Sequence, residues 1–202
     1  MHSAHKPARP AAAPTVRVAV YSQHFTKSDI RLLSDVLGNR REGFGSVFRF
    51  WFVPVSAAHP FQASASGKQA AFDHTIVITK LSSARIRRMY PGETHVHNMS
   101  FTYVGRSPTA IVFNADNWDR KPDKFTLGLE EYRTYLINHE FGHALGLFHH
   151  QESSPSRCPL MYQQTRGTTH CERVDLFPSA SQRQQVLSYV QNLSVNTERG
   201  EP

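Results

Sequence analysis

Four histidines and one glutamate fall within the segment NHEFGHALGLFHH, residues 138–150. His139 and His143 are four residues apart, so on a helix they lie on one face, one turn apart, and both imidazoles can reach one ion. Glu140 follows His139 directly, which sets its carboxylate beside the ion without making it a ligand. This H-E-x-x-H spacing predicts two zinc ligands and a general base on a single helix.

A third ligand requires the chain to leave that helix and turn back. Gly146 tolerates a positive φ and can end the helix in such a turn, so that His149 approaches the ion from another side. Three imidazoles leave a fourth coordination position for water, as in catalytic zinc sites. His150 is the alternative third ligand, although the spacing after the glycine favours His149. The competing interpretation is a helix whose histidines are merely packed or solvated.

The rest of the chain must build a fold that positions this helix. Apolar runs rich in β-branched and aromatic residues predict strands, and capping residues followed by apolar residues at helical spacing predict helices. The predicted strands are 15–21, 46–55, 74–80, 99–105 and 109–115, of which 74–80 and 109–115 are apolar enough to be buried. A polar stretch, 56–70, reads as a loop.

Four helices are predicted. The first begins after a capping pair, Thr26 and Asp29, and ends at Gly38 in a left-handed cap. A short helix follows Ser82 or Ser83. The histidine helix spans about 130–145, and its apolar face consists of Ile137, Phe141, Ala144 and Leu145. The last helix spans about 180–193 and is capped by Ser179 and Gln182.

Residues 139–149 fill the motif H-E-x-x-H-x-x-G-x-x-H, and Met161 follows later in the chain. In this the chain resembles the metzincin clan of zinc peptidases, in which the same motif precedes a methionine in a tight turn. It is similar to small, mostly bacterial metzincin-like proteins that have a YRxYLxNHExGHxLG helix, a later QQT and paired cysteines. The matching residues here are Tyr132, Arg133, Tyr135, Leu136, Asn138, Gln163, Gln164 and Thr165.

The resemblance implies an α+β fold with a twisted, mixed five-stranded sheet, helices, an active-site helix, a Met-turn and a C-terminal helix. It implies one metallopeptidase domain at 15–193, with an upper lobe at about 15–146 and a lower lobe at about 147–193. Residues 1–14, rich in Ala and Pro, would form a disordered leader, and 194–202 a flexible tail.

The same resemblance implies a zinc-dependent endopeptidase that hydrolyses peptide bonds with a metal-activated water. Glu140 would be the catalytic general base, and Met161 a hydrophobic floor under the metal site. The residues that bind Zn²⁺ would be His139, His143 and His149. A protein or peptide substrate is expected to lie extended along an edge strand near 99–105.

One departure from the family concerns Tyr162. It follows Met161 directly, whereas several metzincin families place a tyrosine two residues after the methionine, where it can assist the oxyanion. Such a role for Tyr162 is therefore in doubt. Two other classes of protein compete with the peptidase hypothesis. They are a catalytically silent, zinc-bearing binding module of the same fold and a structural protein without metal.

The overall charge does not point to a particular partner. The formal net charge is +7 and charged residues make up 19% of the chain. Basic residues cluster only briefly and no aromatic-and-basic module appears, so nucleic acid is not an expected partner. No apolar run approaches the roughly 18 residues that cross a bilayer. We expect a monomer without a membrane span.

Two cysteines, Cys158 and Cys171, follow the histidine segment. A disulfide between them would close a short loop and indicate an oxidising compartment. The alternatives are two free thiols in a cytosolic protein and a second metal site that includes His170. The paired cysteines and the family resemblance lead us to expect a secreted or extracellular protein, although the first residues show no apolar core typical of a signal peptide.

Overall fold

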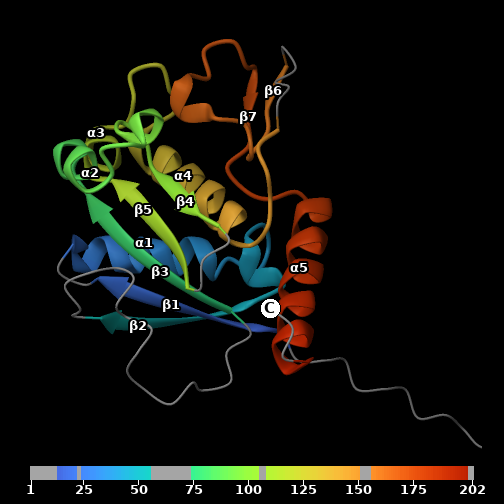
Figure 1. Cartoon of the computed structure of the whole chain (residues 1–202). Coiled ribbons are helices and arrows are strands. Elements are labelled where there is room, and N and C mark those ends of the chain that lie inside the picture. Colours follow the sequence, from blue (N-terminus) through green and yellow to red (C-terminus); the bar gives the residue numbers. More distant parts are fainter. Residues whose placement is uncertain (1–12, 22–23, 56–73, 105–107, 151–155, 200–202) are drawn as a thin grey trace, which may run out of the picture.

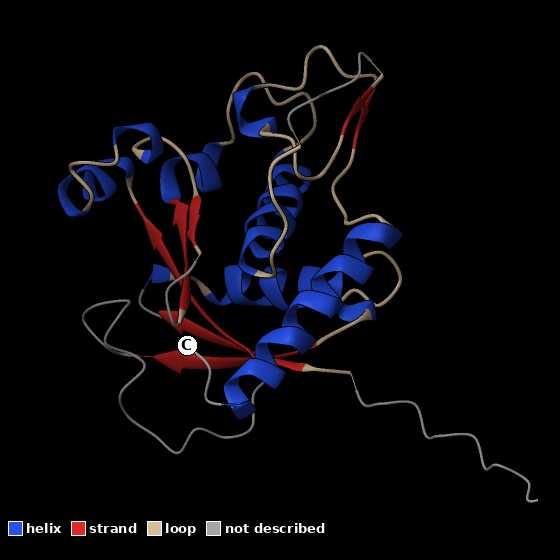
Figure 2. Ribbon diagram, turned by 45° about the vertical axis from the view of Figure 1, so that its right-hand side comes forward, coloured by secondary structure: helices blue, strands red, loops and turns tan. Residues whose placement is uncertain are grey.

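A computed structural model describes residues 13–21, 24–55, 74–104, 108–150 and 156–199. The expected loop at 56–70 and nearly all of the expected leader lie outside these residues. Within them the chain forms a five-stranded sheet, a two-stranded sheet and five α-helices (Figures 1 and 2). The α+β class expected from the sequence is thereby confirmed.

The large sheet has the strand order β2-β1-β3-β5-β4. Its strands are β1 (Thr15–Tyr21), β2 (Arg49–Val55), β3 (His74–Leu81), β4 (Phe101–Tyr103) and β5 (Thr109–Asn114). Strands β2, β1, β3 and β5 are parallel, and β4 runs antiparallel to β5, so the sheet is mixed as expected. All of β5 is buried, as its apolar run predicts. Strand β4, the last in the strand order, lies at an edge of the sheet.

Helices α1 (Lys27–Leu37) and α4 (Leu129–Ala144) cover one face of this sheet (Figure 1). The main core forms where Leu33 of α1 and Phe141 of α4 meet Ile76 of β3. Helix α5 (Ala180–Arg199) lies beside the amino ends of β1 and β3 and adds Val186 and Val190 to the same core. These contacts hold α4 firmly against the sheet.

The other face of the sheet is covered in part by α2 (Ser83–Met89), whose Ile86 packs against Leu81 and Val112. Ser82 caps this helix by accepting a hydrogen bond from the backbone N–H of Arg85. The prediction of a short helix capped by Ser82 or Ser83 is therefore confirmed with Ser82.

Helix α4 is buried on more than the predicted apolar face. Ile137, Phe141, Ala144 and Leu145 are buried, as the helical spacing predicts. Most of its polar positions near the site, including Asn138, are buried as well. The reason is that α4 lies between the sheet and the segments that follow it, so that it is enclosed on several sides (Figure 2).

Several predicted boundaries need correction. Gly38 ends α1, but with φ −76° and not in the left-handed region, because its N–H bonds back to Ser34 and continues the helical geometry. Strand β2 begins only at Arg49, since a 3-10 turn, Phe44–Ser46, precedes it. Strand β4 is shorter than the predicted 99–105. The structure also contains an unpredicted helix, α3 (Ala115–Arg120), which Asn114 caps by accepting from two backbone N–H groups.

A small parallel sheet, β6 (Arg157–Cys158) with β7 (Arg173–Val174), organises the segment after α4. A disulfide joins Cys158 to Cys171, with the Cα atoms 5.7 Å apart. The predicted disulfide is thus confirmed, and the free-thiol alternative is wrong. The bridge ties together two stretches that have little regular structure of their own.

Asp29 links three elements of the fold through one carboxylate. Its backbone and side chain form the predicted capping box with Thr26 at the start of α1. One carboxylate oxygen accepts from Lys80 Nζ on β3 at 2.8 Å, and the other accepts from Trp118 Nε1 on α3 at 2.8 Å. Burial alone would raise the pKa of Asp29, but the hydrogen bonds from Lys80, Thr26 and Trp118 outweigh it and lower the pKa.

No helix in the described part of the chain is long and apolar enough to cross a membrane.

Replacing Asp29 with Asn should lower the free energy of unfolding by about 3 kcal/mol, because Lys80 is left charged and mostly buried without its partner. The amide oxygen of Asn can still accept hydrogen bonds at the cap. Because the folded-state pKa of Asp29 is lowered, its contribution is present above about pH 4 and is lost as the pH falls through the folded value. Urea unfolding at several pH values measures both effects.

The matched control is Asp35→Asn, which removes the exposed α1 ion pair with Arg31. That variant should unfold at nearly the parent urea concentration. Equal loss of stability in both variants would contradict a special role for Asp29.

Candidate metal centre

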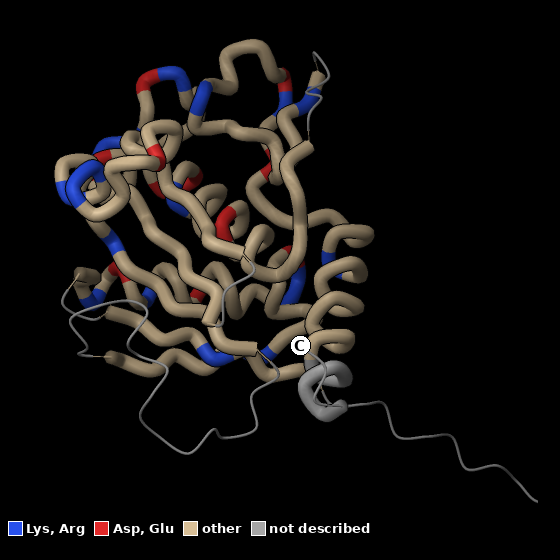
Figure 3. The backbone as a smooth tube through the Cα atoms, in the orientation of Figure 1, with Lys and Arg blue, Asp and Glu red and all other residues tan. Residues whose placement is uncertain are grey.

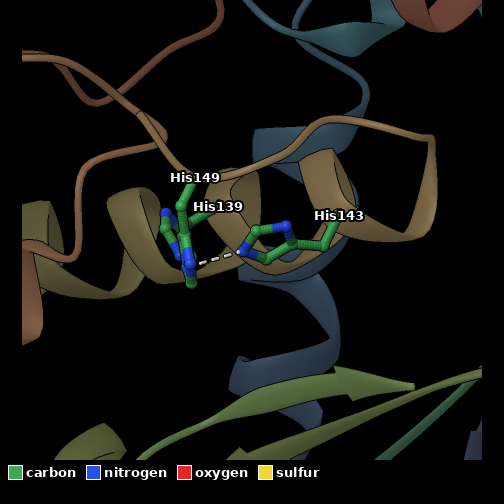
Figure 4. A group of neighbouring side chains, drawn as sticks. All are labelled: His139, His143 and His149. Carbon is green, nitrogen blue, oxygen red and sulfur yellow. Dashed lines mark hydrogen bonds between the residues drawn. The ribbon is translucent and has the colours of Figure 1, made fainter. Parts of the chain in front are cut away.

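The three histidines predicted as ligands meet in space. Their ligating nitrogens all lie within 4.8 Å of one another. His139 and His143 extend from α4, and His149 approaches from the loop that follows, so that the rings turn toward one another (Figure 4). The Nε2 atoms of His143 and His149 are 3.0 Å apart. The site thus combines two ligands from one helix face with a third from the returning chain.

Backbone carbonyls set the tautomers of the two helical histidines. His139 Nδ1 lies 2.8 Å from the carbonyl oxygen of Leu160, and His143 Nδ1 lies 2.8 Å from that of Leu147. Because a carbonyl oxygen can only accept, both Nδ1 atoms carry the proton and both Nε2 atoms present a lone pair. A metal-binding histidine typically donates its other ring N–H in this way. The donor set therefore fits a divalent cation such as Zn²⁺.

The electrostatic environment keeps these imidazoles neutral. Burial lowers the pKa of His139 to about 3, with a further contribution from His143. Burial also lowers the pKa of His143 to about 4. The pKa of His149 is lowered by burial first and by the charge of Arg166 second. Neutral imidazole is the form that binds a metal ion, so the ligands do not have to lose protons near neutral pH.

Gly146 makes the return of the chain possible. Its φ is +92°, and the N–H groups of Gly146 and Leu147 donate to the carbonyls of His143 and Gly142. This is the pattern of a Schellman motif, which ends helices at a left-handed glycine. A Cβ on Gly146 would also lie 2.6 Å from the ring of Tyr189 on α5. Both the backbone angle and the packing therefore require glycine here.

Met161 packs against α4, the helix that carries His139 and His143. A Cβ on Gly142 would lie 2.8 Å from the Met161 sulfur, so the methionine contacts the helix backbone between the two helical ligands. Met161 is buried and lies in a turn closed by a hydrogen bond from the N–H of Tyr162 to the carbonyl of Pro159. The N–H of His150 donates to the Met161 carbonyl and joins the ligand loop to this turn.

The QQT residues support this arrangement. The side-chain amide of Gln164 lies within 3.2 Å of the backbone carbonyls of Cys158 and Pro159, and 3.0 Å from that of Asp175. It therefore clamps the turn that carries Met161. Gln163 Nε2 lies 3.5 Å from His149 Nε2, and the Thr165 hydroxyl lies 3.3 Å from that of Tyr132.

Glu140 lies in the wall of the same site, nearly inaccessible to solvent. One carboxylate oxygen accepts a hydrogen bond from the hydroxyl of Thr102 at 2.7 Å. Burial raises the pKa of Glu140 to about 7, and the Thr102 hydrogen bond acts in the opposite direction. A carboxylate with a pKa near the ambient pH can both accept and return a proton. No pattern in the sequence marks Thr102 as a site residue beyond its place in a predicted strand.

A hollow of about 320 Å³ opens at this centre. The three histidines and Glu140 line it, together with β4 at the edge of the sheet. An extended chain placed along β4 would therefore pass beside the histidines. The arrangement brings candidate ligands, a titratable carboxylate and an edge strand to one accessible place.

Other predicted residues lie elsewhere. His150 is exposed and is not part of the three-histidine group. Tyr162 does not line the hollow; its ring lies 5.7 Å from that of His170. Cys158, His170 and Cys171 form a second group with ligating atoms within 4.8 Å, but the two sulfurs are bonded to each other. The second metal site is therefore not favoured by the bridged structure.

The purified chain should bind about one zinc ion, with His149 and not His150 as the third ligand. Loss of a group that only hydrogen-bonds a metal ligand typically weakens metal binding by roughly 10- to 100-fold. His149→Ala removes a ligand itself and should therefore weaken zinc binding by more than this. His150→Ala should bind zinc as tightly as the parent does. Competitive titration with a chromogenic chelator measures the affinity. Parent-like binding by His149→Ala would rule out its assignment.

Gly146→Ala should lower the free energy of unfolding by roughly 2 kcal/mol, because the left-handed backbone and the ring of Tyr189 both oppose a side chain. Gly92→Ala is the matched control, since a Cβ there meets no heavy atom within 4 Å. Chemical unfolding of both variants provides the comparison, and an unchanged Gly146→Ala would show that the turn does not need glycine.

Comparison with known proteins places the whole site inside one family. A family model described as a protein of unknown function, DUF3152, matches residues 57–192, about two thirds of the chain. This span includes the three histidines, Glu140, Met161 and both cysteines. No curated protein matches the chain. The chain belongs to the DUF3152 family.

Proposed function

We propose that this protein is a zinc-dependent endopeptidase. One observation carries the proposal: three imidazoles converge at a hollow that the buried carboxylate of Glu140 also lines and that an edge strand borders. A site that only binds a metal does not need the carboxylate, and a site that only binds a peptide does not need the imidazoles. Together they are the components of metal-assisted hydrolysis.

His139, His143 and His149 would hold the ion through nitrogen ligands and leave a coordination position open. When bound, Zn²⁺ supplies a Lewis acid that polarises a carbonyl group and makes water a stronger acid. The carbonyls of Leu160 and Leu147 keep the two helical rings oriented, so that little reorganisation accompanies binding.

Glu140 would act as the general base. Its carboxylate takes a proton from the water that attacks the peptide carbonyl, and then donates that proton to the nitrogen of the leaving amine. The hydroxyl of Thr102 holds one carboxylate oxygen and leaves the other available for proton transfer.

Strand β4 would position the substrate. Among the described strands it is the last in the order and pairs with β5, and it lines the hollow that contains Glu140. An edge strand would offer backbone N–H and C=O groups to an extended peptide, which would add as a further strand. Thr102 lies on this strand, so the element that binds the substrate main chain also positions the base.

The buried Glu140 favours this function over the silent binding module. Burying a carboxylate disfavours its charged form, as the raised pKa shows, and a module that only bound zinc or peptide would gain nothing from that cost. We further propose that the protein acts in an extracellular compartment, because the Cys158–Cys171 disulfide is compatible with an oxidising environment.

Glu140→Gln should retain zinc and fold normally but lower kcat for peptide cleavage by roughly 10²- to 10⁴-fold, because the amide cannot accept the proton while it can still accept the Thr102 hydrogen bond. A peptide library incubated with the zinc-loaded parent, the variant and the parent plus a chelator measures this. Cleavage by Glu140→Gln at the parent rate, or cleavage that survives removal of the metal, would refute the proposal.

A further inference from the structure

The hollow at the metal centre extends well beyond the residues that the proposed chemistry uses. Besides the histidines and Glu140, its lining includes Glu93, His95 and Val96 from the segment before β4. Glu93 is half-exposed, with 47% of its side chain accessible. The hollow therefore leads from the reacting centre, past the edge strand, to a second carboxylate near its rim.

The part of the hollow outside the candidate metal centre carries a negative charge. The formal net charge of the chain is +7, yet none of the described residues that line the hollow is Lys or Arg, and Glu93 lies in this lining outside the metal centre. Arg166 acts on the pKa of His149 but does not line the hollow. Strand β4 carries neither Lys nor Arg along its length (Figure 3). The Zn²⁺ of the proposed site would offset the charge of Glu140, so the carboxylate of Glu93 is the group that would attract a cationic side chain.

Much of the lining contributed by β4 and its neighbours is apolar or aromatic. Met99, Phe101, Tyr103 and Val104 all line the hollow. The rings of Phe101 and Tyr103 are 5.3 Å apart at right angles, and both lie close to the ring of Tyr90. Val104 is 48% exposed. Such walls favour an aliphatic stem, and aromatic faces attract a cation.

We infer that this hollow receives a Lys or Arg side chain of the peptide substrate, with its charge at Glu93 and its methylene groups against the walls formed by β4. The inference rests on the proposed endopeptidase function, since it names the side chain that would lie beside the cleaved bond. Lys and Arg combine an apolar stem with a charged end. The stem matches the apolar and aromatic residues of the lining, and the charged end matches the carboxylate of Glu93.

Other side chains fit this hollow less well. An acidic side chain would be repelled by the carboxylate of Glu93, and a purely apolar one would shield Glu93 from water without adding a charged partner. His95 Nδ1 lies 3.6 Å from a Glu93 oxygen, but its side chain is 71% exposed and does not close the rim. The contact at Glu93 is therefore open to a substrate cation.

The test uses a peptide series in which one Lys is moved through the positions around a fixed cleavable segment, with norleucine as the uncharged isostere and Glu as the opposite charge. The zinc-loaded full chain should show a higher kcat/KM for Lys than for norleucine at one position. Glu93→Gln should reduce that ratio by about fivefold, the scale of a partly exposed ion pair. Glu42→Gln, an exposed change outside the hollow, is the charge-matched control and should keep the ratio.

Binding separates this inference from the proposed function. The same peptides, labelled with fluorescein, are titrated with zinc-loaded Glu140→Gln protein and with Glu140→Gln/Glu93→Gln protein. Tighter binding of Lys than of norleucine peptides that depends on Glu93 supports the inference, even if the parent cleaves none of them and the endopeptidase proposal fails. Equal binding of Lys and norleucine peptides, or a preference for Lys that survives Glu93→Gln, overturns it.

Discussion

The hydrogen bond from His139 Nδ1 to the carbonyl oxygen of Leu160 joins the two parts of the candidate metal centre. Its donor belongs to α4, which the sheet holds, and its acceptor belongs to the turn that carries Met161. Each part fixes the other: the carbonyl sets the tautomer of the ligand, and the ring limits where the turn can lie. The histidines keep their relative positions only while these two segments, which are distant in sequence, stay in contact.

That contact depends on how closely the turn can approach the helix. Gly142 has no side chain, so the sulfur of Met161 can reach the helix backbone, and Leu147 fills the adjacent space. The amide of Gln164 then holds the turn from its outer side through three backbone carbonyls. A small displacement of the helix or of the turn would therefore move the candidate ligands, because packed interiors transmit displacements.

Local sequence patterns were sufficient for the features that depend on neighbours along the chain. The spacing of His139 and His143, the helix end at Gly146 and the capping boxes of α1 and α5 all depend on residues within a few positions, and the structure contains each of them. Sequence patterns also located the five strands of the main sheet, although not all their ends.

Features that depend on distant contacts were not predictable in the same way. Thr102 reaches Glu140 only because β4 pairs with β5 and lies over α4, and nothing next to Thr102 in sequence encodes this. The clamp made by Gln164 joins carbonyls from two sides of a disulfide loop, which no periodicity records. The left-handed cap predicted at Gly38 was wrong for a different reason. A glycine at a helix end can adopt the left-handed region but does not have to.

The three ligands differ in how far the fold supports them. His139 is buried and His143 is partly buried, both on α4, whereas His149 is exposed on the loop after it. The segment 156–179 has only two-residue strands, and the disulfide and Gln164 compensate for this lack of regular structure. An ion held by all three histidines would add a further cross-link between α4 and this loop, since binding to the folded state alone stabilises it. The proposed cofactor would therefore stabilise the less regular half of the site as well as take part in its chemistry.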